Sequence, residues 1–518
     1  MGLAWWTGLG EDPSQRSVEV EGRREAAAFK EVYPLLEPYV YAAITKDPKT
    51  LGLVYVVIEP TLQPGEKETL ERIKSILIET LDVDLNELGS REEAEKLLKK
   101  RIEEAVRDYK IKLQPEAIDK IEYYLVRDLV KYGRIDPLMY DHMIEDISCD
   151  GPGIPIYVWH REYESIPTNI SFESDEELDS FVIRLAYLAG KHISIANPIL
   201  DASLPDGSRI QLTLGKEVTR RGSTFTIRRF RADPLTVTDL IMFNTLTAEM
   251  AAWFWLAIEK KANLIIGGGT ASGKTTTLNA LSAFIPPDSK VITIEDTPEL
   301  NLPHQNWIPS VARTGFGPAG SSAEITLFDL LKAAMRQRPD YIIVGEVRGE
   351  EAFTLFQAMA TGHGGLSSIH CDSVQAALNR LESEPMNIPR SLLTTLNAVA
   401  MQSRIRIKGR TARRIGHVAE IAGLDPVSKD IITSDVYRWD PVEDAFKYSG
   451  RSLIAEKIRE RFGLSEDEVE RELERRRTVL EWMVKAGIRR YDAVGRAVRE
   501  YYADPDRTYQ RARLELSL

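Results

Sequence analysis

A glycine-rich segment in the middle of the chain has the residue types and spacing needed to hold phosphate groups. The segment reads Gly268-Gly269-Thr270-Ala271-Ser272-Gly273-Lys274-Thr275 and fits the pattern G-x-x-x-x-G-K-[ST] in full. Its glycines let the backbone turn N–H groups toward a β-phosphate, while Lys274 would bridge the β- and γ-phosphates. The Thr275 hydroxyl would ligate Mg²⁺, and Thr276 opens the helix expected next. The sequence therefore predicts a P-loop ATPase that uses ATP and Mg²⁺.

Two apolar runs further along the chain end in acidic residues. Val291–Ile294 is followed by Glu295 and Asp296, and Tyr341–Val344 leads into Glu346. Ligands of an open parallel sheet bind beyond the carboxyl ends of its strands, so these acids should face the phosphate loop. We expect Glu346 to activate the attacking water or to hold Mg²⁺ through a water molecule. Glu295 is a second catalytic candidate, although with Asp296 it could instead cap the next helix.

Two histidines bracket the following strand candidate. His363 precedes Leu366–Ile369 and His370 follows it. A single histidine is usually an ordinary core or surface residue, but a strand of an ATPase sheet lies between these two. We therefore expect both to sense the γ-phosphate or to couple its loss to movement. Arg348, two residues after Glu346, is a third sensor candidate.

The pattern along the chain predicts an α/β protein with several parts. We expect a charged helical region over 1–120, an α+β domain over 121–231, a linker over 232–246, an ATPase domain over 247–450 and a helical tail over 451–518. Ser90 and Glu93 have the spacing of a capping box for a helix that runs to Tyr109. The linker is predicted from Pro234, because a proline disfavours helix in the residue before it.

Composition narrows the class of protein. The 518 residues carry a net charge of -12, which gives no general attraction to nucleic acid. The two cysteines, Cys149 and Cys371, cannot form a disulfide framework or a four-cysteine zinc site, so we expect no zinc. Apolar stretches fall short of the ~20 residues of a membrane span, and the first residues lack a basic leader. We expect a cytoplasmic protein that attaches to a membrane only peripherally.

The four motifs between Gly268 and His370 resemble, in order, the Walker A, Asp, Walker B and His boxes of the type II/type IV secretion ATPase superfamily. Ile144–Ile147 and Leu204–Arg209 look like its archaeal branch, whose members assemble pili or archaella. The resemblance implies a RecA-like core, a separate PAS-like N-terminal domain and a homohexamer that acts on a polytopic membrane platform protein. From the acidic balance of the chain we expect no direct nucleic-acid partner. It also implies that an N-terminal arginine reaches the γ-phosphate, and Arg209 and Arg228 are the candidates.

The chain departs from the bacterial pattern at Gly349, where those members usually have an aspartate after the Walker B arginine. Two other functions stay open on the sequence. One is a DNA-directed motor, such as a conjugation ATPase or a helicase, which the acidic balance disfavours. The other is a nucleotide-binding scaffold with little turnover, against which the presence of both Lys274 and Glu346 argues.

Overall fold

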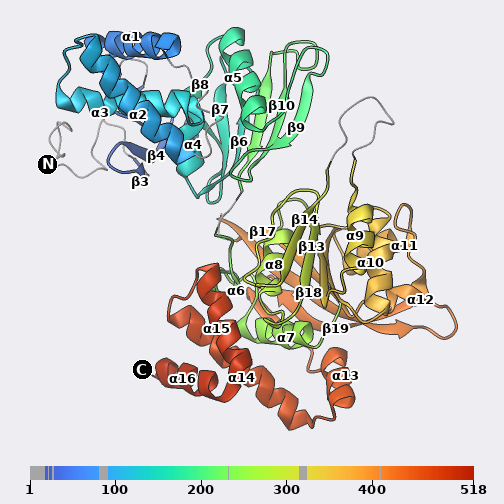
Figure 1. Cartoon of the computed structure of the whole chain (residues 1–518). Helices are drawn as coiled ribbons and strands as arrows, with labels where there is room; N and C mark the ends of the chain where they lie inside the picture. The colour runs from blue at the N-terminus through green and yellow to red at the C-terminus, as the bar shows by residue number, and fades with distance from the viewer. Residues whose placement is uncertain are drawn as a thin grey trace. The chain divides into compact units, whose positions relative to one another are not determined.

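The computed structural model describes residues 18–20, 23–25, 29–48, 50–80, 91–230, 233–313, 324–407 and 410–517. The chain divides into two compact units, Met1–Phe230 and Arg231–Leu518 (Figure 1). The first residues, on which the expectation of no leader rests, and Ser90 of the expected capping box lie outside the described residues.

The first unit is built on a mixed sheet of nine strands with the order β3-β4-β5-β8-β7-β6-β11-β10-β9. Its strands are β3 (Glu31–Leu36), β4 (Val40–Lys46), β5 (Leu53–Ile58), β6 (Ile144–Cys149), β7 (Pro155–His160), β8 (Glu164–Ser171), β9 (Ile199–Ser203), β10 (Arg209–Thr213) and β11 (Thr224–Arg228), and a separate pair is formed by β1 (Val18–Val20) and β2 (Arg23–Glu25). Its helices are α1 (Pro64–Thr80), α2 (Arg91–Asp108), α3 (Pro115–Leu129), α4 (Asp136–Tyr140) and α5 (Asp175–Leu188), with a 3₁₀ turn at Gly133–Ile135.

The expectation of a helical region over 1–120 is wrong for its first half, because β3, β4 and β5 lie there. Helices α1 to α3 do follow, and they pack around their own apolar cluster, which includes Leu77, Leu98 and Leu125. The strands form because they extend a sheet whose other members lie beyond residue 140. The hydroxyl groups of Tyr33 and Tyr55 both donate to Asp141, at 2.7 and 2.6 Å. Local charge patterning could not show these distant partners.

The second unit has a nine-stranded sheet with the order β14-β13-β15-β16-β12-β17-β18-β19-β20. The strands are β12 (Leu264–Gly268), β13 (Val291–Glu295), β14 (Trp307–Val311), β15 (Tyr341–Val344), β16 (Gly364–His370), β17 (Ala398–Ile407), β18 (Arg410–Leu424), β19 (Ile431–Asp440) and β20 (Ala445–Tyr448). The six from β14 to β17 run parallel, and β18 to β20 continue the sheet antiparallel.

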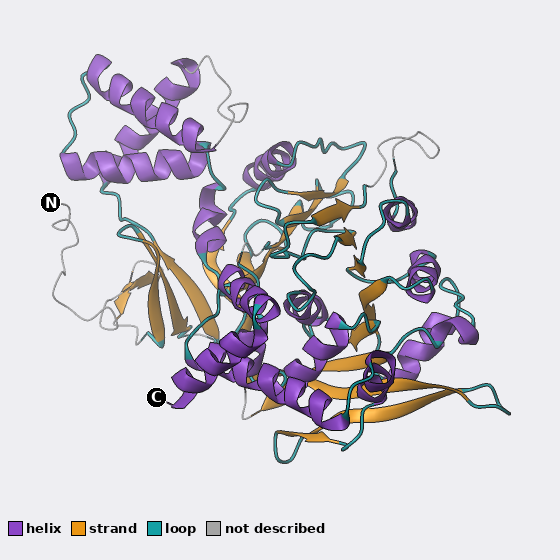
Figure 2. Ribbon diagram, turned by 60° about the horizontal axis from the view of Figure 1, so that its bottom comes forward, coloured by secondary structure: helices purple, strands orange, loops and turns teal. Residues whose placement is uncertain are grey.

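Helices cover both faces of this sheet (Figure 2). They are α6 (Val237–Met242), α7 (Ala248–Glu259), α8 (Lys274–Ser282), α9 (Leu327–Met335), α10 (Glu351–Ala360), α11 (Val374–Glu382), α12 (Arg390–Leu393), α13 (Leu453–Phe462), α14 (Glu466–Lys485), α15 (Tyr491–Ala503) and α16 (Pro505–Ser517). Successive strand residues point to opposite faces. Accordingly Leu264 and Ile266 join the core under α7, α8 and α14, while Ile265 joins the core under α9, α10 and α11. The second unit thus contains the RecA-like α/β core that the sequence predicted.

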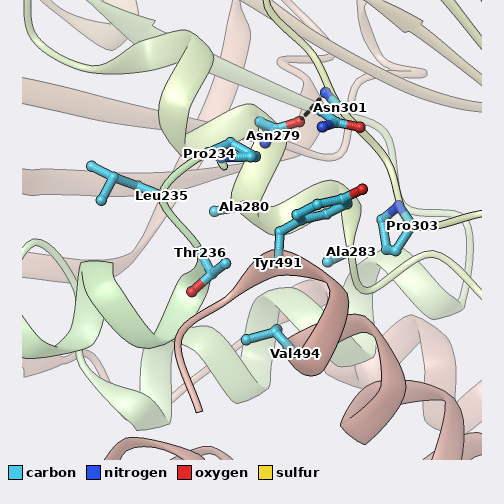
Figure 3. Close-up of a pocket in the computed structure, with 10 residues that line it drawn as sticks. All are labelled: Pro234, Leu235, Thr236, Asn279, Ala280, Ala283, Asn301, Pro303, Tyr491 and Val494. Atoms are coloured by element: carbon cyan, nitrogen blue, oxygen red, sulfur yellow. Dashed lines mark hydrogen bonds between the residues drawn. The ribbon is translucent and has the colours of Figure 1, made fainter. Parts of the chain in front are cut away.

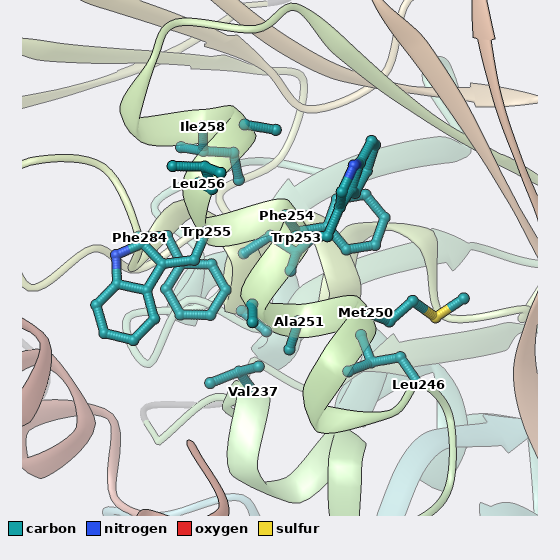
Figure 4. Packing of buried hydrophobic residues seen from close by; sticks show 14 of the residues in the cluster. Val237, Leu246, Met250, Ala251, Trp253, Phe254, Trp255, Leu256, Ile258 and Phe284 are labelled. Atoms are coloured by element: carbon teal, nitrogen blue, oxygen red, sulfur yellow. The ribbon is translucent and has the colours of Figure 1, made fainter. Parts of the chain in front are cut away.

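Helix α7 is apolar around its whole circumference. Every residue from Met250 to Ile258 is buried, and the indole of Trp255 stacks on the ring of Phe284 with centroids 4.9 Å apart (Figure 4). A helix that is hydrophobic on all sides must be enclosed. The C-terminal helices provide part of this enclosure, because Arg476 of α14 forms an ion pair with Glu259 at the end of α7.

The expected linker over 232–246 is wrong in its middle, where α6 is a helix packed into the core. Val237 is fully buried, and Thr236 starts the helix with a capping box to Asp239. The carboxylate of Asp239 also accepts a hydrogen bond from the Arg489 side chain, at 2.7 Å. Pro234 does precede the helix, so the proline marks its start rather than a longer unstructured connection.

Candidate active site

The phosphate loop joins the end of β12 to the start of α8, as its pattern requires. Helix α8 begins at Lys274, and Gly273 precedes it with a left-handed φ of 94°. The Lys274 ammonium donates to the carbonyl of Gly269 at 3.0 Å, and the Ser272 hydroxyl donates to the same carbonyl at 2.9 Å. Helix α8 thus begins directly at the loop, where the N–H groups of its first turn and its dipole favour an anion.

Two of the loop glycines are required by their surroundings. A Cβ on Gly273 would lie 2.9 Å from Nε2 of Gln402, in addition to the strain of a positive φ. A Cβ on Gly268 would lie 2.6 Å from the Ser272 hydroxyl and would also meet the carbonyl of Gln402. Gly269, by contrast, has open space where its Cβ would be. The two close approaches explain why the first and sixth positions of the motif are glycine here.

Glu346 lies at the same edge of the sheet as the phosphate loop. It follows β15, which is separated from β12 only by β16, so these two strands run roughly 10 Å apart side by side. The Ser368 hydroxyl of β16 donates to the carbonyl of Gly345 at 2.7 Å and fixes the start of this segment. The Glu346 carboxylate accepts a hydrogen bond from Arg348 at 2.7 Å, which raises the pKa of that guanidinium. The structure thus places Glu346 and Arg348 together.

Glu295 is buried at the end of β13 and binds backbone rather than a cation. Its Oε1 accepts hydrogen bonds from the N–H groups of Glu299 and Leu300, at 2.9 and 3.0 Å. Burial raises the pKa of this carboxyl to about 7, against the lowering by those two hydrogen bonds. A Cβ on Gly345 would lie 3.1 Å from Cγ of Glu295, so the acid supports the segment that carries Glu346. Its neighbour Asp296 is exposed and lies 3.8 Å from Arg348.

The two histidines lie at opposite ends of β16. His370 pairs in register with Gly268, directly beside the start of the phosphate loop. His363 precedes the seven-residue strand, which separates it from His370 by roughly 20 Å along the strand. The ring of His363 there contacts Thr361 and the carbonyl of Ala358, at 3.1 Å each. The structure brings His370, and not His363, to the phosphate loop of its own chain.

The candidate arginine fingers lie side by side in the first unit. Arg209 of β10 and Arg228 of β11 are cross-strand partners, and both are exposed. Their neighbour Arg229 instead donates to the backbone carbonyls of Leu138, Met139 and Asp141 and anchors the turn there. Of the basic residues in this stretch, the geometry therefore presents Arg209 and Arg228 as a pair.

Two residues at the phosphate loop were not expected from the sequence. Gln402 of β17 pairs with Gly268 in register and is buried, and Arg413 of β18 donates from Nε to the carbonyl of Ala271 at 3.2 Å. Both lie more than a hundred residues from the loop in the chain. The only available signal was the basic run from Arg404 to Arg414, which has no motif of its own.

A small pocket lies at the far end of α8 from the phosphate loop. It is lined by Pro234, Leu235, Thr236, Asn279, Ala280, Ala283, Asn301, Pro303, Tyr491 and Val494. Figure 3 shows Tyr491 of α15 lying between Thr236 and Pro303, and the Asn279 side chain accepts a hydrogen bond from the Asn301 N–H at 2.8 Å. The pocket shares no residue with the phosphate loop, so it belongs to the packing of the tail rather than to the site.

The donor set fits a magnesium nucleotide. The hydroxyl of Thr275 and the carboxylate of Glu346 are hard oxygen ligands of the kind that Mg²⁺ prefers, and both belong to this edge of the sheet. The left-handed Gly273 and the N-terminus of α8 form the cradle in which a Cβ at position 273 could not fit. Fold and site together define a P-loop protein of the RecA-like class.

Comparisons with known proteins identify the family. The model of the family described as Type II/IV secretion system protein matches residues 129–490. The chain is 38% identical over 496 residues to the protein MJ0900 of Methanocaldococcus jannaschii, covering 91% of this chain and 88% of that protein. It is 32% identical over 321 residues to the type IV secretion system protein PtlH of Bordetella pertussis, covering 56% of this chain and 92% of PtlH. The crystal structure of the VirB11 ATPase from the Brucella suis type IV secretion system, in complex with sulphate, is 26% identical, with a TM-score of 0.28 over 57% of this chain and 96% of that one.

The chain therefore belongs to the type II/IV secretion system protein family, as its four motifs indicated. Within the described residues, every helix is too short or too polar to cross a lipid bilayer.

Proposed function

We propose that this chain is a secretion ATPase that hydrolyses ATP between Lys274 and Glu346. The observation that carries the proposal is the position of these two residues at one edge of one parallel sheet, with a single strand between their own strands. A phosphate cradle alone would support binding only. A carboxylate held beside the cradle adds a group that can polarise water, and this favours hydrolysis over a scaffold role.

Each residue has a distinct part in the proposed reaction. Bound Mg²⁺ would supply charge neutralisation on the phosphate oxygens. The loop N–H groups and Lys274 bind and orient the phosphates, while Thr275 and Glu346 hold the metal, the latter through water. Glu346 orients the attacking water and draws its proton. Glu295, whose pKa lies near neutrality, serves as a second acid that supports the Glu346 segment. His370 and Arg348 respond to loss of the γ-phosphate.

We further propose that Arg209 and Arg228 complete the site in a homohexamer. Arg209 and Arg228 lie directly opposite each other on adjacent strands, and each planar guanidinium can bind two oxygens of a multiply charged anion such as a γ-phosphate. ATP binding would then close the two units on the nucleotide and hydrolysis would release them. This cycle would drive a polytopic membrane platform protein that assembles a pilus-like or archaellum filament, or a type II-like secretion machine. The protein would lie in the cytoplasm, peripheral to the cell membrane.

The test is ATP hydrolysis by the purified full chain with Mg²⁺, alone, with vesicles of anionic lipid and with DNA, together with its mass in solution. Wild type is compared with Lys274→Ala and Glu346→Gln. The matched control is Lys332→Ala, which removes an exposed lysine of α9 outside the loop. We expect Lys274→Ala to lose nucleotide binding and Glu346→Gln to keep it while turnover falls at least ~100-fold.

Several results would change the proposal in defined ways. Undiminished turnover by Glu346→Gln would remove the role assigned to that acid. ATP binding without turnover in all conditions would favour the nucleotide-binding scaffold. Stimulation by DNA in place of lipid would favour a DNA-directed motor such as a conjugation ATPase.

A further inference from the structure

We propose that Arg413 is a positioning residue that holds the phosphate loop in its binding conformation from the neighbouring β17–β18 hairpin. The inference rests on the nucleotide site proposed above and extends that site to a residue about 140 positions away in the chain. Its guanidinium donates from Nε to the carbonyl of Ala271 at 3.2 Å. Ala271 is at the tip of the loop, between the glycines at positions 269 and 273.

Ala271 is the residue of the loop that most needs such support. Its φ is 55°, in the left-handed region, although it carries a Cβ. For a residue other than glycine, this conformation costs roughly 1–2 kcal/mol and persists only where surrounding contacts impose it. The hydrogen bond from Arg413 fixes the orientation of the Ala271 carbonyl and thereby stabilises the strained peptide.

The side chain of Arg413 also packs against the second left-handed position of the loop. A Cβ on Gly273 would lie 3.1 Å from Cδ of Arg413 and 2.9 Å from Nε2 of Gln402. Gln402 is 2% exposed, and its Oε1 is buried without a hydrogen-bond partner. The hairpin therefore contacts the loop through one side chain from each of its strands, and the two contacts meet at Gly273.

The charge of the hairpin agrees with this role. Arg404 of β17 is the cross-strand partner of Arg413, so the register sets two cationic residues opposite each other beside a loop that binds phosphate. Because Arg413 is tied to the loop backbone, a shift of the hairpin would be transmitted to Ala271. Nucleotide affinity should thus depend on the position of this hairpin, which links the antiparallel part of the sheet to the phosphate site.

The experiment measures the affinity of the full chain for a fluorescent ATP analogue with Mg²⁺. The single variants are Arg413→Ala and Arg413→Lys. A double variant combines Arg413→Ala with Ala271→Gly, and the single variant Ala271→Gly is its reference. The control Arg406→Ala removes an exposed arginine of the same hairpin. Amide hydrogen exchange of residues 270–273 without nucleotide gives a second readout that does not depend on binding.

We expect Arg413→Ala to weaken binding about five-fold, the equivalent of one hydrogen bond, and to speed exchange in the loop. Arg413→Lys retains a donor and should recover at least half of the loss. Glycine adopts a positive φ without steric cost, so the effect of Arg413→Ala should fall below two-fold in the Ala271→Gly background. The Arg406→Ala control should bind and exchange as wild type does.

The failure of this inference differs from the failure of the proposed function. Wild-type affinity and loop exchange in Arg413→Ala would overturn the role of Arg413 while leaving the nucleotide site intact. An equal loss in both backgrounds would also overturn it, because Arg413 would then act on the nucleotide directly. A wild-type chain that binds no nucleotide would refute the proposed function, and the exchange measurement would still decide the role of Arg413.

Discussion

Glu295 should make the second unit less stable as the pH rises from 5 to 8. Glu295 is 4% exposed, and burial raises the pKa of its carboxyl from 4.5 to about 7. Between pH 4.5 and about pH 7, the folded state holds a proton on Glu295 that the unfolded state has lost. Stability is therefore fully present below pH 4.5 and is lost as the pH rises through 7. A shift of this size corresponds to about 3 kcal/mol.

The variant Glu295→Gln removes this dependence with little change in shape. An amide oxygen can still accept the N–H groups of Glu299 and Leu300, but it does not titrate. Relative to wild type, the variant should gain about 2.5 kcal/mol between pH 5 and pH 8, or roughly 4 °C in the midpoint of thermal unfolding. Scanning calorimetry of both proteins at the two pH values measures the difference. Turnover in the same samples reports whether Glu295 also takes part in hydrolysis.

The control for this prediction is Glu350→Gln, which changes an exposed carboxylate four residues after Glu346. Its midpoint should follow that of wild type at both pH values. Parallel pH profiles of Glu295→Gln and wild type would refute the reasoning, because they would mean that the buried carboxyl is ionised across the range.

Three further predictions concern the loop, the histidines and the tail. Gly273→Ala should weaken nucleotide binding at least ten-fold in a fluorescence titration, since its Cβ has no room and its φ is 94°; wild-type affinity would contradict the close packing. His370→Ala should lower ATP turnover more than His363→Ala, and the reverse order would show that the distant histidine acts in another subunit's site. Arg476→Ala should cost up to about 3 kcal/mol, because it removes the buried partner of Glu259, whose other partner Lys260 is more exposed, and should expose the tail to limited proteolysis; an unchanged digestion pattern would show that the tail is held by other contacts.

The sequence alone predicted the parts of the site that are contiguous in the chain. The phosphate loop is recognisable because its glycines, Lys274 and Thr275 stand at fixed spacing in one short segment. Glu346 was predictable for a related reason, since an apolar run that ends in an acid marks a buried strand with its end at the ligand edge. Alternation of buried residues such as Leu264 and Ile265 then follows from strand geometry.

Tertiary structure alone decided the features that depend on partners far away in the chain. The strands β3 to β5 form because they pair with strands that lie much later in the chain. Helix α6 is a helix because the C-terminal helices pack on it. The same holds for Arg229, which donates to backbone carbonyls within residues 138–141. It also holds for Arg413, which lies near Ala271 only because the β17–β18 hairpin brings it there. Spacing encodes contacts within a loop or along one strand, whereas hydrogen bonds across hundreds of residues arise only when the sheet assembles.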